Sequence, residues 1–416
     1  MRQKKKEQKD PENLRIDELK ELLLQKLERT LNASDEEILS MIDEVLIEAG
    51  HERYLRLSQR DRIRRELFNS IRRLDILQEL LDDNTVTEIM VNGTDGIFIE
   101  QAGALQKWQK SFQDPEKIKD IVQQIAAGVN RVANESKAIV DARLPGGARV
   151  NAVMPPIALN GPIITIRRFP DEPILMRQLI EWGSISQEAA AFLEQLVRAG
   201  YNIFISGGTG SGKTTFLNAL SNAIPKDERI ITIEDNAELQ IQQASNLVRL
   251  EARRPNEEGE GEVTIRDLIR TSLRMRPDRI IVGEVRGEET LDMLQSLNTG
   301  HDGSLSTGHG NSPKDMLSRL EIMTLLAKDL PISAVRRQIA SGIDIMVHLG
   351  RMRDKTRKVL EILEIDGYQM QTGEILTHSL YRFEEEGEDA DGRITGTLRS
   401  CGTLKNRGKL RRAGME

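Results

Sequence analysis

Apolar residues between positions 13 and 81 recur every three or four residues, with charged residues between them. Leu19, Leu23 and Leu27 illustrate this spacing, which is that of a helix with one buried face. We therefore predict a small helical bundle over residues 13–81, preceded by a disordered basic segment at residues 1–12.

Beyond residue 81 the pattern changes to short apolar runs separated by turn residues. Three such runs, at residues 139–144, 148–155 and 163–169, are typical of strands. A helical pattern follows Asp114 and Pro115, a residue pair that often starts a helix. Together these features predict an α+β domain over residues 82–169.

Two prolines within residues 170–174 predict a linker between domains, because proline interrupts regular structure. From residue 175 to 383, strand-like and helical patterns alternate. The apolar runs at 203–206, 229–233 and 279–282 are almost continuous, as in strands covered on both faces. This pattern predicts a doubly wound parallel sheet. The charged residues 384–416 are predicted to form a solvated tail.

The first buried strand of this region leads into a glycine-rich loop and then a helical pattern. The loop fits the motif G-x-x-x-x-G-K-[ST], whose backbone N–H groups surround phosphate oxygens. A turn without a ligand is the alternative, but the strand before the loop and the helix after it favour a nucleotide site. The predicted nucleotide-binding residues are Gly207, Gly208, Thr209, Gly210, Ser211, Gly212, Lys213, Thr214 and Thr215.

Acidic residues stand at the ends of two later strands. Glu234 and Asp235 follow one run and Glu284 ends another, and parallel strands present their carboxyl ends to the same crevice. Nucleotide hydrolysis needs carboxylates to hold Mg²⁺ and to orient the attacking water. We therefore predict Glu234, Glu284 and Lys213 as catalytic residues, although acids at strand ends can also serve as caps or ion-pair partners. The predicted Mg²⁺ site comprises Thr214, Glu234 and Asp235.

Gly283 stands where most P-loop enzymes have an aspartate. This difference argues against ordinary helicase and transporter classes. The next polar stretch, residues 298–313, contains His301 and His309. Zinc binding is disfavoured because no cysteine or acid pair completes a site. We predict instead a loop that senses the γ-phosphate through Thr307 and His309.

Three arginines of the α+β domain, Arg143, Arg149 and Arg167, lie near predicted strand ends. Arginines beside a nucleotide can stabilise charge on a transferred phosphoryl group. Solvated strand arginines are the alternative, and spacing alone favours that reading.

Composition narrows the possible partners. The formal net charge of −7 and an aromatic content of 3% give no reason to expect nucleic-acid binding. A single cysteine excludes a disulfide framework within the chain. No apolar run approaches the length of a membrane span, so membrane work would proceed through a bound partner.

Four motifs together resemble the ATPases of type II and type IV secretion and of pilus assembly, and in particular the Tad/Flp-type pilus assembly branch. They are GGTGSGKT at 207–214, TIEDNAEL at 232–239, RIIVGEVRG at 279–287 and TGHDGSLSTGHG at 299–310. The resemblance covers roughly residues 80–415. Each later motif alone is weak, but their order and spacing are specific.

The resemblance implies an α/β P-loop NTPase (RecA-like) motor domain preceded by an α+β N-terminal domain and a helical bundle. It implies a cytoplasmic homo-hexamer that uses ATP and Mg²⁺ and works on a polytopic inner-membrane platform protein. In the family, acids matching Glu234 and Glu284 share the base and Mg²⁺-linked roles, and arginines matching Arg143, Arg149 and Arg167 are candidates for contact with the γ-phosphate. Arg286 is implied to relay the nucleotide state.

The expected function is ATP-driven pilus assembly or protein secretion. A nucleic-acid translocase, a pilus retraction motor and a non-catalytic nucleotide switch are the alternatives. The sequence leaves open the cargo, the direction of work and which glutamate is the base.

Overall fold

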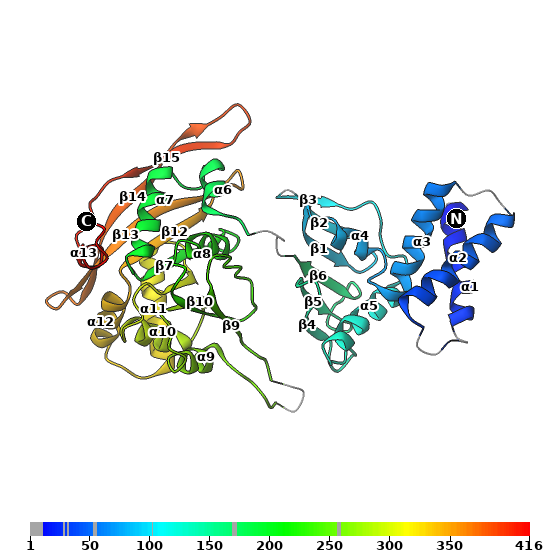
Figure 1. Ribbon diagram of the computed structural model, residues 1–416, viewed down its shortest axis with the longest axis horizontal. Helices are drawn as coiled ribbons and strands as arrows, with labels where there is room; N and C mark the ends of the chain where they lie inside the picture. Colours follow the sequence, from blue (N-terminus) through cyan, green and yellow to red (C-terminus); the bar gives the residue numbers. More distant parts are fainter. Residues whose placement is uncertain are drawn as a thin grey trace, which may run out of the picture. The chain divides into compact units, whose positions relative to one another are not determined.

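The computed structural model describes residues 11–27, 30, 33–52, 56–101, 103–168, 173–255 and 259–416. The chain forms two compact units, Met1–Asp171 and Glu172–Glu416 (Figure 1). Most of the predicted disordered segment, residues 1–10, and the linker residues 170–172 lie outside the described residues.

The first unit starts with the predicted helical bundle. Its core contains Leu23, Ile42 and Leu67, all fully buried, as expected for helices with one apolar face. The bundle helices are α1 (Pro11–Leu27), α2 (Asp35–Glu52) and α3 (Leu57–Arg72).

The rest of this unit is a six-stranded sheet in the order β3-β2-β1-β6-β5-β4, with every neighbouring pair antiparallel. Its buried side chains pack with those of α4 (Leu77–Asp82) and α5 (Pro115–Gly128). Asp114 caps α5 by accepting from the Glu116 N–H. The α+β prediction is therefore confirmed. The strands are β1 (Val86–Asn92), β2 (Ile97–Gln101), β3 (Ala104–Lys107), β4 (Ile139–Arg143), β5 (Arg149–Val153) and β6 (Ile163–Arg167).

The second unit contains a nine-stranded sheet in the order β15-β14-β13-β12-β7-β11-β10-β8-β9. The strands from β12 to β9 are parallel, and β13, β14 and β15 extend the sheet in antiparallel fashion. The predicted parallel sheet is present, but the antiparallel extension was not foreseen. The strands are β7 (Ile203–Gly207), β8 (Arg229–Glu234), β9 (Asn246–Glu251), β10 (Arg279–Val285), β11 (Leu305–His309), β12 (Ile345–Arg351), β13 (Arg357–Gln369), β14 (Glu374–Glu388) and β15 (Ile394–Ser400).

Helices cover both faces of this sheet (Figure 1). Successive residues of a strand point to opposite faces, so Ile203 and Ile205 join one core while Phe204 joins the other. Among the described residues, no helix has the length and hydrophobicity needed to cross a membrane. The first core takes α6 (Met176–Glu181), α7 (Gln187–Arg198) and α8 (Lys213–Ser221), and the second takes α9 (Ile265–Ser272), α10 (Glu289–Leu297), α11 (Pro313–Ala327) and α12 (Ile332–Gly342).

The prediction of a solvated tail at residues 384–416 is wrong. These residues complete β14, form β15 and end in a short helix, α13 (Gly408–Arg412). Leu398 and Leu410 join the core of the second unit. The charged residues that suggested a tail occupy solvent-facing strand positions and pair with each other, as Arg399 does with Glu384.

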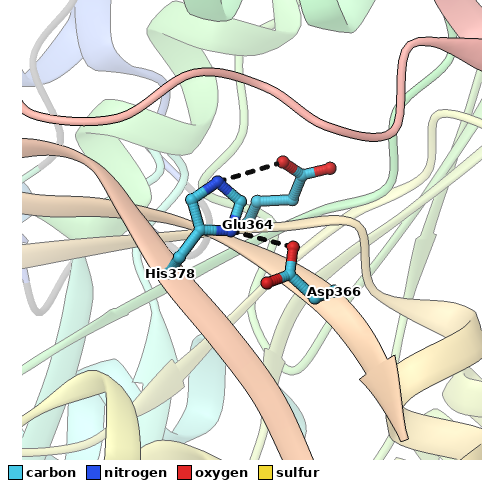
Figure 2. A group of neighbouring side chains, drawn as sticks. All are labelled: Glu364, Asp366 and His378. Atoms are coloured by element: carbon cyan, nitrogen blue, oxygen red, sulfur yellow. Dashed lines mark ion pairs between the residues drawn. The ribbon is translucent and has the colours of Figure 1, made fainter.

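A histidine between two carboxylates helps to fasten the C-terminal segment to β13 (Figure 2). His378 Nδ1 lies 2.8 Å from Asp366 Oδ1, and its Nε2 lies 3.5 Å from Glu364 Oε2. The buried Glu364 carboxylate also accepts the backbone N–H groups of Lys405 and Asn406. Because the two carboxylates lie beside different ring nitrogens, the group links β14, which carries His378, to β13, which carries Glu364 and Asp366.

Candidate active site

The glycine-rich loop connects the central strand β7 to the N-terminus of α8. Gly212 precedes the helix with a φ of 90°, a conformation that favours glycine. The first N–H groups of a helix have no partner inside the helix, so they are free to face a phosphate. The structure thus brings the predicted nucleotide-binding residues into one strand–loop–helix unit.

The Lys213 side chain is 7% exposed and lies along this loop. It donates to the carbonyl oxygens of Gly207 (3.2 Å) and Gly208 (3.1 Å) and to His309 Nδ1 (3.1 Å). Burial lowers the pKa of Lys213, against the attraction of Glu284. In this position the ammonium group is held where the loop would receive a phosphate.

His309 connects this lysine to one of the predicted catalytic acids. Its Nε2 lies 2.8 Å from Glu284 Oε1. Burial and the charge of Lys213 lower the pKa of His309, which favours the neutral ring. Since Lys213 donates to Nδ1, the ring proton belongs on Nε2, facing Glu284.

Thr307 and His309 were predicted to lie in a loop, but both lie in β11, between β7 and β10. Thr307 donates to the Gly283 carbonyl oxygen at 2.7 Å and so ties β11 to β10. The structure therefore explains Thr307 as a strand-to-strand contact. His309 is the last residue of β11, at the nucleotide edge of the sheet.

Glu284 is held from its other side by an arginine. Arg286 Nη2 lies 2.8 Å from Glu284 Oε2, and Arg286 Nη1 lies 3.6 Å from Asp235 Oδ2. Lys213, His309, Glu284, Arg286 and Asp235 therefore form a continuous line of charged and polar groups along the nucleotide edge. Binding of a phosphate to Lys213 would therefore change the electrostatic interactions of the other groups in this line.

Glu234 has a different environment, although it ends the neighbouring strand β8. It is 3% exposed, and its Oε1 accepts the N–H groups of Glu238 (2.9 Å) and Leu239 (3.0 Å). Burial raises its pKa to about 7. Its Oε2 is buried and has no hydrogen-bond partner among the described residues. This oxygen therefore has unused capacity to accept a hydrogen bond.

The structure explains the glycine at position 283. A Cβ on Gly283 would lie 2.9 Å from Glu234 Cγ, which is closer than packed carbon atoms approach. An aspartate at this position would push Glu234 aside. Glycine therefore makes room for the buried glutamate.

The predicted Mg²⁺ ligands are hard oxygen groups, the type that Mg²⁺ prefers. Thr214 lies in the first turn of α8, Glu234 is buried and Asp235 is about half exposed beside Arg286. The unpartnered Oε2 of Glu234 fits a cation or its bound water. The residue set is thus compatible with Mg²⁺, with Asp235 the most exposed of the three.

The three predicted arginines lie in the first unit, in one row across its sheet. Arg143 is the register partner of Arg149, which is in turn the partner of Arg167. Register partners project from the same face, opposite the buried Val150 and Ile166. Arg167 also lies 3.7 Å from Glu88, so the row ends in an ion pair. The alignment of all three across separate strands could not be read from their spacing.

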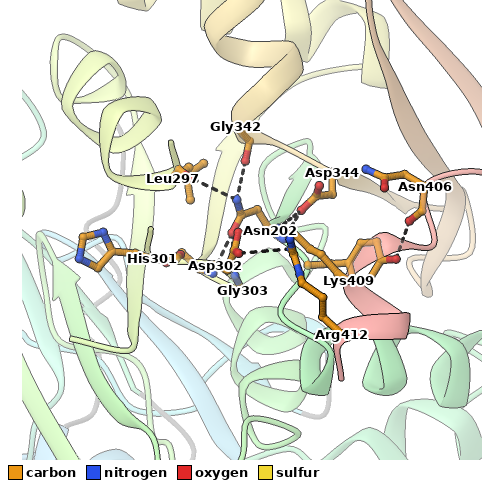
Figure 3. Close-up of polar contacts among 12 residues, drawn as sticks. Asn202, Leu297, His301, Asp302, Gly303, Gly342, Asp344, Asn406, Lys409 and Arg412 are labelled. Carbon is orange, nitrogen blue, oxygen red and sulfur yellow. Dashed lines mark hydrogen bonds and ion pairs between the residues drawn. The ribbon is translucent and has the colours of Figure 1, made fainter. Parts of the chain in front are cut away.

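A polar network joins β7 and β11 at their N-terminal ends, away from the glycine-rich loop (Figure 3). Asn202 Oδ1 accepts the N–H groups of Gly303 and Ser304, just before β11. Asp344 accepts the Asn202 N–H and pairs with Lys409, which comes from α13. Burial raises the pKa of Asp344, against the effect of Lys409. The network fixes the start of the strand that carries His309. It could not be predicted from the sequence because its residues are far apart in the chain.

Comparison with known proteins identifies the family. A family model described as "Type II/IV secretion system protein" matches residues 70–395. A putative conjugal transfer protein of Mycobacterium tuberculosis is 38% identical over 293 residues, which make up 69% of this chain and 83% of that protein. The type IV secretion system protein PtlH of Bordetella pertussis is 32% identical over 320 residues, or 71% and 94% of the two chains.

Two solved structures support the fold. The Legionella pneumophila ATPase DotB aligns with a TM-score of 0.52 and 22% identity, covering 69% of this chain and 79% of its own. The pilus retraction motor PilT with bound ADP aligns with a TM-score of 0.51 and 18% identity, covering 82% and 86%.

Proposed function

Because the chain belongs to the type II/IV secretion system protein family, we propose that it is a Mg²⁺-dependent ATPase that drives pilus assembly or protein secretion. The observation that carries this proposal is the line from Lys213 through His309 to Glu284 beside the glycine-rich loop. A scaffold that only bound nucleotide would not require two further acids at the same sheet edge.

In this proposal the loop amides and Lys213 bind the β- and γ-phosphates of ATP. Mg²⁺, held by Thr214 and Asp235 directly or through water, would neutralise phosphate charge. His309 keeps Glu284 oriented and senses the position of Lys213. These groups position the triphosphate with a ready-made charge arrangement.

We assign the general base to Glu234 and the positioning role to Glu284. A base is most effective when its pKa is close to the working pH, and burial raises the pKa of Glu234 to about 7. Glu284 Oε2 is already paired with Arg286, and His309 Nε2 lies 2.8 Å from Glu284 Oε1. The free Oε2 of Glu234 is the atom proposed to accept a proton from the attacking water.

The arginine row is proposed to contact the γ-phosphate when the two units close on a nucleotide. Its support is the alignment of Arg143, Arg149 and Arg167 on one exposed sheet face. Three guanidinium groups in a row offer planar donors to phosphate oxygens. Domain closure would then couple hydrolysis to movement.

The partners proposed are five further copies of the chain and a polytopic platform protein on the cytoplasmic side of the inner membrane. This proposal rests on the resemblance of the four motifs and on the names of the relatives, which include conjugal transfer and type IV secretion proteins. The narrower assignment to the Tad/Flp-type branch stays a prediction. Cargo and direction of work are left open.

The test uses two variants of the full chain. Lys213→Ala is expected to abolish ATP turnover with an unchanged circular dichroism spectrum. Glu284→Gln, which is expected to retain ATP, is used to capture partners from native membranes for mass spectrometry. Recovery of a polytopic membrane protein with pilin-like or secreted subunits supports the proposal. Normal turnover by Lys213→Ala would show that the site is assigned wrongly.

A nucleic-acid translocase is the second candidate, because two relatives are named conjugal transfer proteins. The net charge of −7 opposes it. ATPase rates measured with and without single- and double-stranded DNA separate the two functions, since only a translocase requires stimulation by DNA.

A further inference from the structure

The turn between β12 and β13 contacts the glycine-rich loop from outside. Arg357, the first residue of β13, donates through Nε to the Gly210 carbonyl oxygen at 2.9 Å. Gly210 lies near the middle of the loop, with a φ of 71°. The contact joins residues 147 positions apart, and nothing in the motif itself points to it.

Arg357 differs from Arg353, which lies within the turn. Arg353 pairs with Glu385 at 2.7 Å and with Glu388 at 2.9 Å. Arg357 has no carboxylate partner among the described residues. Its hydrogen bond goes to the Gly210 carbonyl oxygen instead. Its charge is therefore not committed to an ion pair elsewhere on the sheet.

The turn that presents Arg357 is itself braced. Asp354 Oδ1 accepts from the Thr356 N–H at 2.9 Å and from its hydroxyl at 2.7 Å. Asp354 Oδ2 accepts the Ile394 N–H at 2.7 Å, from the start of β15. A turn fixed within itself and against a neighbouring strand can hold an arginine in a constant position.

We propose that Arg357 is a positioning residue of the nucleotide site, acting through the Gly210 peptide. The C=O and N–H groups of a trans peptide point in opposite directions. A donor that holds the Gly210 carbonyl on one side of this peptide therefore keeps the next N–H, of Ser211, on the other side, where it donates to the Gly208 carbonyl oxygen at 3.3 Å and closes the loop. Glycine-rich backbone is otherwise free to sample many conformations, so the bond reduces the ordering that a phosphate must impose.

The expected result for Arg357→Gln is a weaker nucleotide site with intact chemistry. This expectation rests on the proposed ATPase function. Kd for a fluorescent ATP analogue and KM for ATP should rise about tenfold, the size expected for one charge-assisted hydrogen bond. The value of kcat should stay within about threefold, because the loop binds ground and transition states alike. Arg357→Lys should recover part of the affinity.

The matched control is Arg382→Gln on β14. Arg382 is also an exposed arginine of the same sheet, and it bonds to Glu361 and Ser379. The control loses the same charge and should bind ATP like the wild type. This comparison separates the Gly210 contact from a general loss of positive charge.

A second readout needs no nucleotide. Hydrogen exchange at the amides of residues 208–212 should be faster in Arg357→Gln than in wild type and control, with equal melting temperatures. Unchanged exchange together with unchanged Kd and KM would overturn the positioning role. If the wild type itself binds no ATP, the proposed function fails, while the exchange rates still decide whether Arg357 orders the loop.

Discussion

The ends of β8 and β10 carry the same residue type at the same edge of one sheet, yet they give it opposite environments. Glu234, on β8, is buried and has one oxygen without a partner. Glu284, on β10, is engaged by Arg286 and His309. Under the proposed function, burial and neighbouring charge, rather than residue type, divide the roles of the two carboxylates.

A glycine makes this difference possible. Gly283 precedes Glu284 on β10 and leaves the space that the Glu234 side chain occupies. The residue just before Glu284 therefore has no side chain, and this leaves room for the side chain of Glu234. The environments of the two acids are therefore coupled through this glycine.

The largest effect is expected from neutralising either acid. Glu234→Gln removes the proposed base and should lower kcat by about 10²–10⁴-fold, the usual contribution of general base catalysis. Glu284→Gln should lower kcat by a similar factor. Single-turnover assays should show bound ATP persisting in both variants. A loss of ATP affinity with unchanged kcat in either variant would contradict a role for that acid in the hydrolysis step.

A smaller effect is expected from filling the space between the strands. Gly283→Ala places a methyl group against Glu234 Cγ, and overpacking of this kind costs about 1–3 kcal/mol. The free energy of unfolding, measured in denaturant, should fall by this amount, and kcat should fall as Glu234 shifts. Gly259→Ala is not a suitable control, because Gly259 has a positive φ. Gly208→Ala is also unsuitable because it alters the loop.

Gly128 offers the matched control, since it lies at the end of α5 and a Cβ there meets no atom within 4 Å. Gly128→Ala should leave both unfolding and turnover close to those of the wild type. Equal stability of the two variants would show that the close approach of Gly283 to Glu234 does not constrain the site.

The smallest effect is expected from releasing Glu284 from its arginine. The Arg286 side chain is 59% exposed, so solvent weakens its interaction with Glu284. Arg286→Gln should therefore reduce kcat by less than about tenfold. The pH at which the rate reaches half its maximum should not move, because that midpoint is assigned to Glu234. Steady-state rates across pH measure both quantities.

The sequence was sufficient for the parts of the site that depend on local order. The strand–loop–helix around Lys213 and the acids at strand ends follow from apolar runs and glycine spacing. Contacts between distant segments were not accessible, such as Arg357 with Gly210 or Asn202 with Gly303. Periodicity identifies a buried face but does not identify the partner across it.

The prediction for the C-terminal residues 384–416 was wrong for a different reason. The density of charged residues over positions 384–416 favours a solvated segment, but Glu384 and Arg399 lie in β14 and β15. These strands have one exposed face, where opposite charges such as those of Glu384 and Arg399 pair across the sheet. Composition alone does not distinguish such a strand from a tail, because the few buried residues, such as Leu398, are widely spaced.

The central claim is that Glu234 is a base whose pKa burial raises to about 7. A base acts when deprotonated, so kcat should rise with pH and reach half its maximum near 7. In the folded protein the raised pKa also favours the protonated acid. Its contribution to stability is therefore complete below its ordinary value of 4.5 and is lost as pH rises through about 7.

The most direct measurement is the pH dependence of kcat for the wild type and for Glu234→Gln, at saturating ATP and Mg²⁺. The account predicts a rise through about pH 7 in the wild type and a low, flat residual rate in the variant. A variant that keeps the wild-type rise would contradict the assignment of Glu234 as the base.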